Sequence, residues 1–93
     1  MFRCPVDLYG FPSEIAPERK VTIDLREGAG MAEVIAELKR EIPGLEGHAF
    51  RQGENRLADL YKFNLNGVLY YDGMDFRVTP GDRLALLTLV TGG

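Results

Sequence analysis

The 93-residue chain has few of the residues on which metal and redox chemistry depends. It contains one cysteine (Cys4), one histidine (His48) and no tryptophan. A single cysteine excludes a disulfide within the chain and any multi-cysteine zinc or iron–sulfur site. We therefore expect no bound metal, no bound cofactor and a reducing compartment, the cytoplasm. His48 has no second histidine or cysteine nearby, so we expect a solvated loop residue instead of a ligand or a base.

Long apolar runs and basic clusters are also missing. No apolar run approaches the ~20 residues that a membrane-spanning helix needs, and the segment 1–5 is too short and mixed for a signal peptide. The 14 acidic residues outnumber the 11 lysines and arginines, which are scattered, and the formal net charge is −3. Nucleic-acid binding is therefore not expected, and neither is membrane contact.

Two segments near the start alternate apolar and polar residues, which is the period of a strand with one buried face. The apolar positions are Phe2, Cys4, Val6 and Leu8 in the first segment and Val21, Ile23 and Leu25 in the second. We expect the two strands to pair antiparallel. Cys4 then belongs to the inward set, which favours a packing role over a redox role.

The period then changes to that of a helix. Its apolar stripe consists of Met31, Val34, Ile35, Leu38 and Ile42, and Pro43-Gly44 ends it. Residues 45–60 show no sustained period, and we interpret them as a long loop with a short helical turn at Leu57–Leu60. Asn66-Gly67 predicts a hairpin between two further strands, because both residues tolerate positive φ.

The order of elements is β-β-α-β-β, which predicts an α+β fold with one helix across one face of a mixed sheet. The last strand, Leu84–Val90, follows the turn Pro80-Gly81-Asp82 and is apolar on both faces, so we expect it beside the first strand and parallel to it. One helix covers only one of these faces. We therefore predict that Ala85, Leu87 and Leu89 point away from the helix and form a partner interface.

The sequence closes on Gly92-Gly93, directly after this strand. Glycine lacks Cβ, so two glycines make a thin, flexible tail that carries a free carboxylate and fits a narrow active site of another protein. An ordinary frayed end is the alternative.

These motifs together resemble one superfamily. They are Phe63-Asn64-Leu65-Asn66-Gly67, Pro80-Gly81-Asp82, the apolar strand Leu84–Val90 and the terminal Gly92-Gly93. The chain resembles the ubiquitin-like β-grasp sulfur carriers, and within them the small subunit of molybdopterin synthase. The resemblance covers nearly the whole chain and is strongest from Lys62 onward. It implies a single β-grasp domain over residues 1–93 with a flexible Gly-Gly tail.

The resemblance also implies a function. In this family a ubiquitin-activating-like adenylating enzyme uses ATP to adenylate the terminal glycine, here Gly93, and a persulfide-derived sulfur converts it to a thiocarboxylate. Gly92 would keep the tail thin. The chain would then be a sulfur-carrying substrate or non-catalytic subunit with no catalytic residue of its own. It would donate sulfur with the molybdopterin synthase large subunit in molybdenum or tungsten cofactor biosynthesis.

Other uses of the same fold stay open at this point. The family's small subunits often carry prolines before the final glycines, where this chain has Thr88-Leu89-Val90-Thr91. Sulfur supply to thiamine, cysteine or tRNA thiolation and ligation to lysines as a protein modifier fit the tail equally well. A β-grasp interaction module without tail chemistry is a further alternative.

Overall fold

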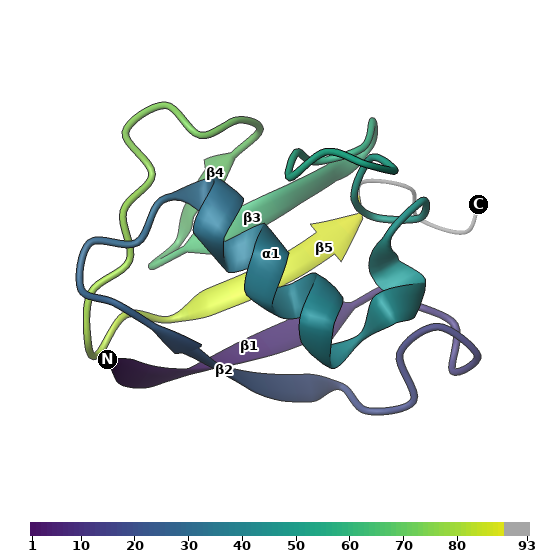
Figure 1. The fold of residues 1–93 in the computed structure, drawn as a ribbon, viewed down its shortest axis with the longest axis horizontal. Coiled ribbons are helices and arrows are strands. Elements are labelled where there is room, and N and C mark those ends of the chain that lie inside the picture. The colour runs from purple at the N-terminus through teal and green to yellow at the C-terminus, as the bar shows by residue number, and fades with distance from the viewer. Residues whose placement is uncertain (89–93) are drawn as a thin grey trace.

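The computed structural model describes residues 1–88 and shows one helix lying across one face of a five-stranded sheet (Figure 1). The strands are β1 (Phe2–Tyr9), β2 (Lys20–Leu25), β3 (Tyr61–Leu65), β4 (Val68–Tyr70) and β5 (Leu84–Thr88). The helix is α1 (Met31–Glu41), and a single 3₁₀ turn, η1 (Pro43–Leu45), follows it. The predicted α+β fold with one main helix on one face of a mixed sheet is confirmed.

The strands lie in the order β2-β1-β5-β3-β4. β1 and β5 are parallel, while β2 runs antiparallel to β1, and β3 runs antiparallel to both β4 and β5. The last strand therefore lies at the centre of the sheet, beside and parallel to the first, as predicted. Its expected end at Val90 is not tested, because residues 89–93 lie outside the described part of the chain.

The first two strands bury the residues that alternation selects. Cys4, Val6, Ile23 and Leu25 are all buried under the helix. Burial, together with the nearby charge of Asp82, raises the pKa of the Cys4 thiol. A protonated, buried thiol is a poor nucleophile, so the predicted packing role of Cys4 is confirmed.

The helix covers the sheet through the predicted apolar stripe. Met31, Val34, Ile35 and Leu38 are buried, and the helix ends at Glu41 directly before Ile42 and η1. Ile42 thus lies just beyond the last turn and is half-buried against the core. Proline has no backbone N–H and fixes its φ, which explains why the chain leaves the helix here.

The segment between α1 and β3 differs from the prediction. The helical turn expected at Leu57–Leu60 is wrong, since Leu57 instead forms an isolated β-bridge with Phe50. The Ala58 N–H donates to the Ala49 carbonyl oxygen at 2.8 Å, which ties this part of the loop back on itself. Leu60 has a φ of 74°, a value that a right-handed helix cannot contain.

The hairpin between β3 and β4 turns at Asn66-Gly67, with φ values of 54° and 90°. The strand after it, β4, ends at Tyr70. The Asn66 side chain also reaches the turn that precedes β5. It accepts a bond from the Arg83 N–H at 2.8 Å and donates one to Asp82 Oδ1 at 3.0 Å. These bonds hold the hairpin and the start of β5 together.

Candidate functional site

The central strand presents two different faces. Leu84 and Leu86 are buried under α1, whereas Ala85 and Leu87 are half-buried on the face that the helix leaves uncovered (Figure 1). We call this the outer face. Ala85 and Leu87 thus lie where the sequence predicts them, while Leu89, the third residue of the predicted interface, lies outside the described residues.

Strand register places the neighbours of these residues in two cross-strand rows. Leu87 lies between Tyr9 of β1 and Lys62 of β3. The second row contains Asp7, Ala85, Asn64 and Leu69, in that order across β1, β5, β3 and β4. Tyr9 is 57% exposed and Leu69 is 43% exposed. Four apolar residues on this face, Tyr9, Leu69, Ala85 and Leu87, come from three strands (β1, β4 and β5), and we call them the outer-face patch. Asn64 of β3 lies between Ala85 and Leu69.

Lys62 is a feature of the outer face that sequence reasoning missed. It is only 2% exposed, although buried lysines are rare. Its Nζ donates to the Tyr71 hydroxyl at 3.0 Å and lies 4.3 Å from the centre of the Tyr71 ring. No carboxylate lies within ion-pair distance of this ammonium in residues 1–88. The alternation of Lys62 with Tyr61 and Phe63 gives no sign of this burial, and nothing in the sequence links residue 62 to Tyr71.

The end of β5 is held on both sides. Thr88 pairs with Tyr61 of β3, and its hydroxyl donates to the Leu60 carbonyl oxygen at 3.2 Å. On the β1 side, Gly10 has a φ of 85°, and a Cβ added there would lie 2.5 Å from Thr88 Cγ2. The positive φ favours glycine at position 10, and any larger residue would also have to displace the Thr88 methyl group. These contacts fix the point from which the last five residues continue.

His48 lies close to the same end of the sheet. Its ring centre is 6.0 Å from that of Phe11 and 5.8 Å from that of Tyr61, and Phe11 and Tyr61 stack with ring centres 5.7 Å apart. His48 lies in a loop, as predicted, but these ring contacts leave it less solvated than expected. His48 is half-buried because the loop that carries it packs against β3.

The described residues hold no group of three or more His, Cys, Asp or Glu side chains with the geometry of a metal site. Among these residues no helix is long and apolar enough to cross a membrane. Gly92 and Gly93, the predicted tail and reactive terminus, lie outside the described residues.

Comparison with solved structures finds the same fold in small proteins and in a two-subunit complex. SAMP1 from Haloferax volcanii superposes with a TM-score of 0.80 and 27% identity over 99% of this chain and 100% of that one. A putative molybdopterin converting factor subunit 1 from Pyrococcus furiosus gives a TM-score of 0.70 and 20% identity, covering 97% of this chain and 100% of that one. A complex of molybdopterin-converting factor subunits 1 and 2 from Helicobacter pylori gives 0.55 and 22%, covering 99% and 100%.

The two molybdopterin-converting factors are similar to this chain in fold alone, because their identity is low. No curated protein matches the chain. The model of the ThiS family, in contrast, matches residues 6–93, which include β5 and the terminal Gly92-Gly93. Since this match spans nearly the whole sequence, the chain belongs to the ThiS family of ubiquitin-like sulfur carriers.

Proposed function

We propose that this chain carries sulfur as a thiocarboxylate on Gly93 and donates it in molybdopterin biosynthesis. The observation that carries the proposal is the ThiS family match, which extends through Gly92-Gly93. The described structure supports it, since β5 is anchored at the centre of the sheet and leads directly toward these residues. The body of the domain then serves to hold and present the tail.

The chemistry follows from the weakness of a carboxylate as an electrophile. In the proposed reaction the Gly93 carboxylate attacks the α-phosphorus of ATP, and pyrophosphate leaves. A persulfide sulfur then attacks the acyl carbon, and AMP leaves with the bonding electron pair. A thiol reduces the resulting acyl disulfide and frees the thiocarboxylate. The chain supplies only the carboxylate, so we propose a carrier and not an enzyme.

Two partners belong to this proposal. An adenylating enzyme binds ATP and activates Gly93, and a large synthase subunit receives the tail and uses its sulfur. The Helicobacter pylori neighbour, a complex of subunits 1 and 2 of molybdopterin-converting factor, supports a two-subunit arrangement. The outer-face patch is the proposed docking surface, because apolar side chains gathered on a sheet face without a covering helix favour an interface. The cytoplasm is the proposed compartment.

Ligation to lysines is the second candidate function. It is favoured by the similarity to SAMP1, since a further neighbour at 26% identity is described as the small archaeal modifier protein 1 of H. volcanii. Both functions begin with the same acyl-adenylate. They differ in the acceptor, which is a sulfur nucleophile in the first case and a lysine amine in the second.

Intact-protein mass spectrometry separates the two functions. The chain is incubated with ATP, its cognate adenylating enzyme and a persulfide donor, with and without a lysine-containing acceptor protein. Replacement of one oxygen by sulfur, without covalent linkage to the acceptor, is the expected result. Linkage to the acceptor without thiocarboxylate would favour the modifier. Neither product from an active enzyme would contradict both functions.

A further inference from the structure

A groove on the helix side of the molecule, away from the outer face, has no part in the chemistry above. It lies between the end of α1, the loop that precedes β2 and the first half of β2, and it encloses about 490 Å³. We infer that this groove binds a second partner protein through an extended segment whose apolar side chains are flanked by lysine or arginine. This inference does not depend on the tail chemistry.

The floor of the groove is apolar. Ile15, Val21 and Ile42 line it, and each packs against the core while keeping part of its side chain accessible. Gly44 lies beside this floor, since a Cβ built there would be in ordinary van der Waals contact with Ile15 Cγ2 at 3.8 Å. The floor can therefore take one or two aliphatic side chains of a partner.

The groove also opens along the free edge of the sheet. β2 is the end strand, and it pairs with β1 alone among the described strands. Lys20, Val21 and Thr22 are consecutive residues that point alternately to the two faces, yet all three line the groove. Lining by three consecutive residues is consistent with a groove that passes the edge of the strand. A partner segment here can add to the sheet as a sixth strand, with its backbone paired to β2.

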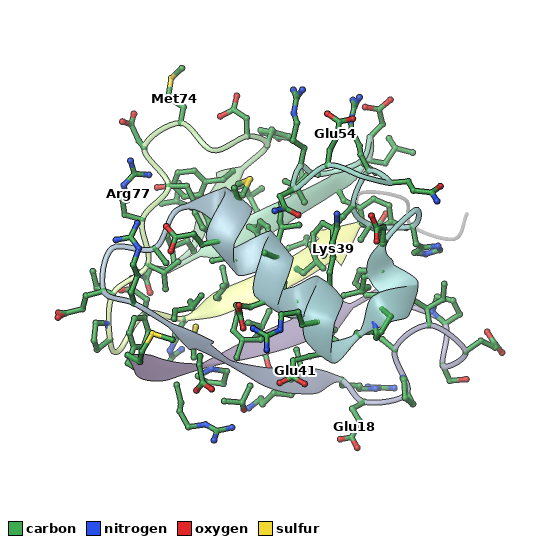
Figure 2. All side chains as sticks on the ribbon, in the orientation of Figure 1. Glu18, Lys39, Glu41, Glu54, Met74 and Arg77 are labelled. Carbon is green, nitrogen blue, oxygen red and sulfur yellow. The ribbon has the colours of Figure 1, made fainter. Side chains whose placement is uncertain are left out.

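The charge around the groove selects the partner. Glu14, Glu18 and Glu41 line it, and none of them has an ion-pair partner within residues 1–88. Figure 2 shows Glu41 in front of the strands near the end of α1, and Glu18 below it at the lower edge of the molecule. Lys20 is the one lysine of the lining. Its Nζ lies 3.8 Å from Asp7 Oδ1, so this side chain is directed to the outer face of the sheet. Three carboxylates beside an apolar floor complement a basic segment and repel an acidic one.

The same charge disfavours a second copy of this chain as the occupant. β2, the segment that would pair edge to edge, is flanked by Glu14, Glu18 and Glu41 in each copy, so two such edges would bring like charges together. The groove and the outer-face patch also belong to opposite sides of the sheet. A partner in the groove can therefore hold the carrier while another protein contacts β5.

A titration with synthetic peptides tests this inference. The blocked peptide Lys-Lys-Val-Ile-Val-Lys is added to the isotope-labelled full chain, and amide chemical shifts are followed. We expect saturable shifts at Val21, Thr22 and Ile42, and none with Glu-Glu-Val-Ile-Val-Glu. Shifts confined to other elements, or equal binding of the acidic peptide, would overturn the proposal.

Charge reversal supplies the matched controls. The double variant Glu18→Lys/Glu41→Lys should bind the basic peptide about tenfold more weakly, because two attractive charge pairs become repulsive. Glu27→Lys reverses an exposed carboxylate away from the groove and should leave the affinity unchanged. Equal weakening by both variants would show a general charge effect and contradict a site. Shifts at the same amides that depend on protein concentration alone would assign the groove to self-association.

Discussion

The two faces of β5 differ in what covers them. Leu84 and Leu86 face α1 and are almost completely buried, whereas Ala85 and Leu87 face outward beside Tyr9 and Lys62. The residue types hardly differ between the two sets. The two sets differ in their surroundings, because α1 packs against one face of the sheet only. An apolar residue on the inner face therefore contributes to the core, whereas one on the outer face stays partly accessible, as the proposed docking role requires.

The largest effect on stability is expected from the inner face. Leu86 is 0% exposed, so Leu86→Ala removes buried methyl groups and leaves a cavity. We expect a loss of about 2–5 kcal/mol in the free energy of unfolding. Denaturant unfolding measures this value. Leu87→Ala is the matched control on the outer face and should cost clearly less, and equal costs would remove the contrast between the faces.

The next effect concerns the buried lysine of the outer face. Tyr71→Phe removes the one hydrogen-bond acceptor that Lys62 Nζ has within residues 1–88. Leaving a buried donor without a partner should cost about 1–3 kcal/mol. Lys62→Met replaces the ammonium with an apolar chain of similar length and should be neutral or stabilising.

Thermal or denaturant unfolding of both single variants and of the double variant tests this pair. The Tyr71→Phe penalty should vanish in the Lys62→Met background, since no ammonium is then left unsatisfied. A full penalty in that background would show that the tyrosine acts through packing alone.

The outer-face patch is predicted to affect binding more than folding. Leu87→Asp should change the free energy of unfolding by about 1 kcal/mol or less, as a substitution near the surface does. Association with the adenylating enzyme should weaken by at least about tenfold, or ~1.4 kcal/mol. Calorimetric titration measures the affinity of the adenylating enzyme for the unsubstituted chain and for the Leu87→Asp variant. Val68→Asp, at an exposed position of β4, is the control, and normal binding by Leu87→Asp would refute the docking role.

The smallest effect is expected at the turn that sets the register of β5. Its Asp82 accepts bonds from the Thr79 N–H at 2.7 Å and from Asn66 Nδ2 at 3.0 Å. The Thr79 N–H, followed by the Asn66 side chain, lowers the pKa of Asp82. Register matters here because a slip by one residue would exchange the two faces of β5.

Asp82 has a lower pKa in the folded state than in the unfolded state, where it is about 3.9. Its ionised carboxylate therefore contributes its full stabilisation above about pH 4, and this contribution is lost as the pH falls through the pKa of the folded state. Asp82→Asn should therefore lower the Tm at neutral pH by no more than about 5 °C. The difference from the unsubstituted chain should shrink below about pH 4. A difference that is constant with pH would exclude the carboxylate as its cause.

Much of the fold was predictable because its elements have strong periods. The stripe of Met31, Val34, Ile35 and Leu38 occurs at helical spacing, and no strand could present it on one face. The central place of β5 followed from its apolarity on both faces. The loop before β3 was not predictable, since the β-bridge between Phe50 and Leu57 joins residues whose local pattern has no period.

The site was predictable only in part, for a similar reason. Alternation placed Ala85 and Leu87 on the outer face, because it depends on neighbouring residues alone. The burial of Lys62 was missed and the exposure of His48 was overestimated, since both depend on Tyr71, Phe11 and Tyr61, which reach them through the tertiary fold. Local patterns show which face a residue takes, but not what covers it.

The central claim is that the domain serves to present Gly93 for activation. Its most direct test is the intact mass of the chain and of a Gly93-deleted variant after incubation with the adenylating enzyme, ATP and a persulfide donor. The account predicts replacement of oxygen by sulfur in the intact chain and none in the variant, with unfolding free energies that agree within about 0.5 kcal/mol. A normal thiocarboxylate yield from the Gly93-deleted variant would contradict it.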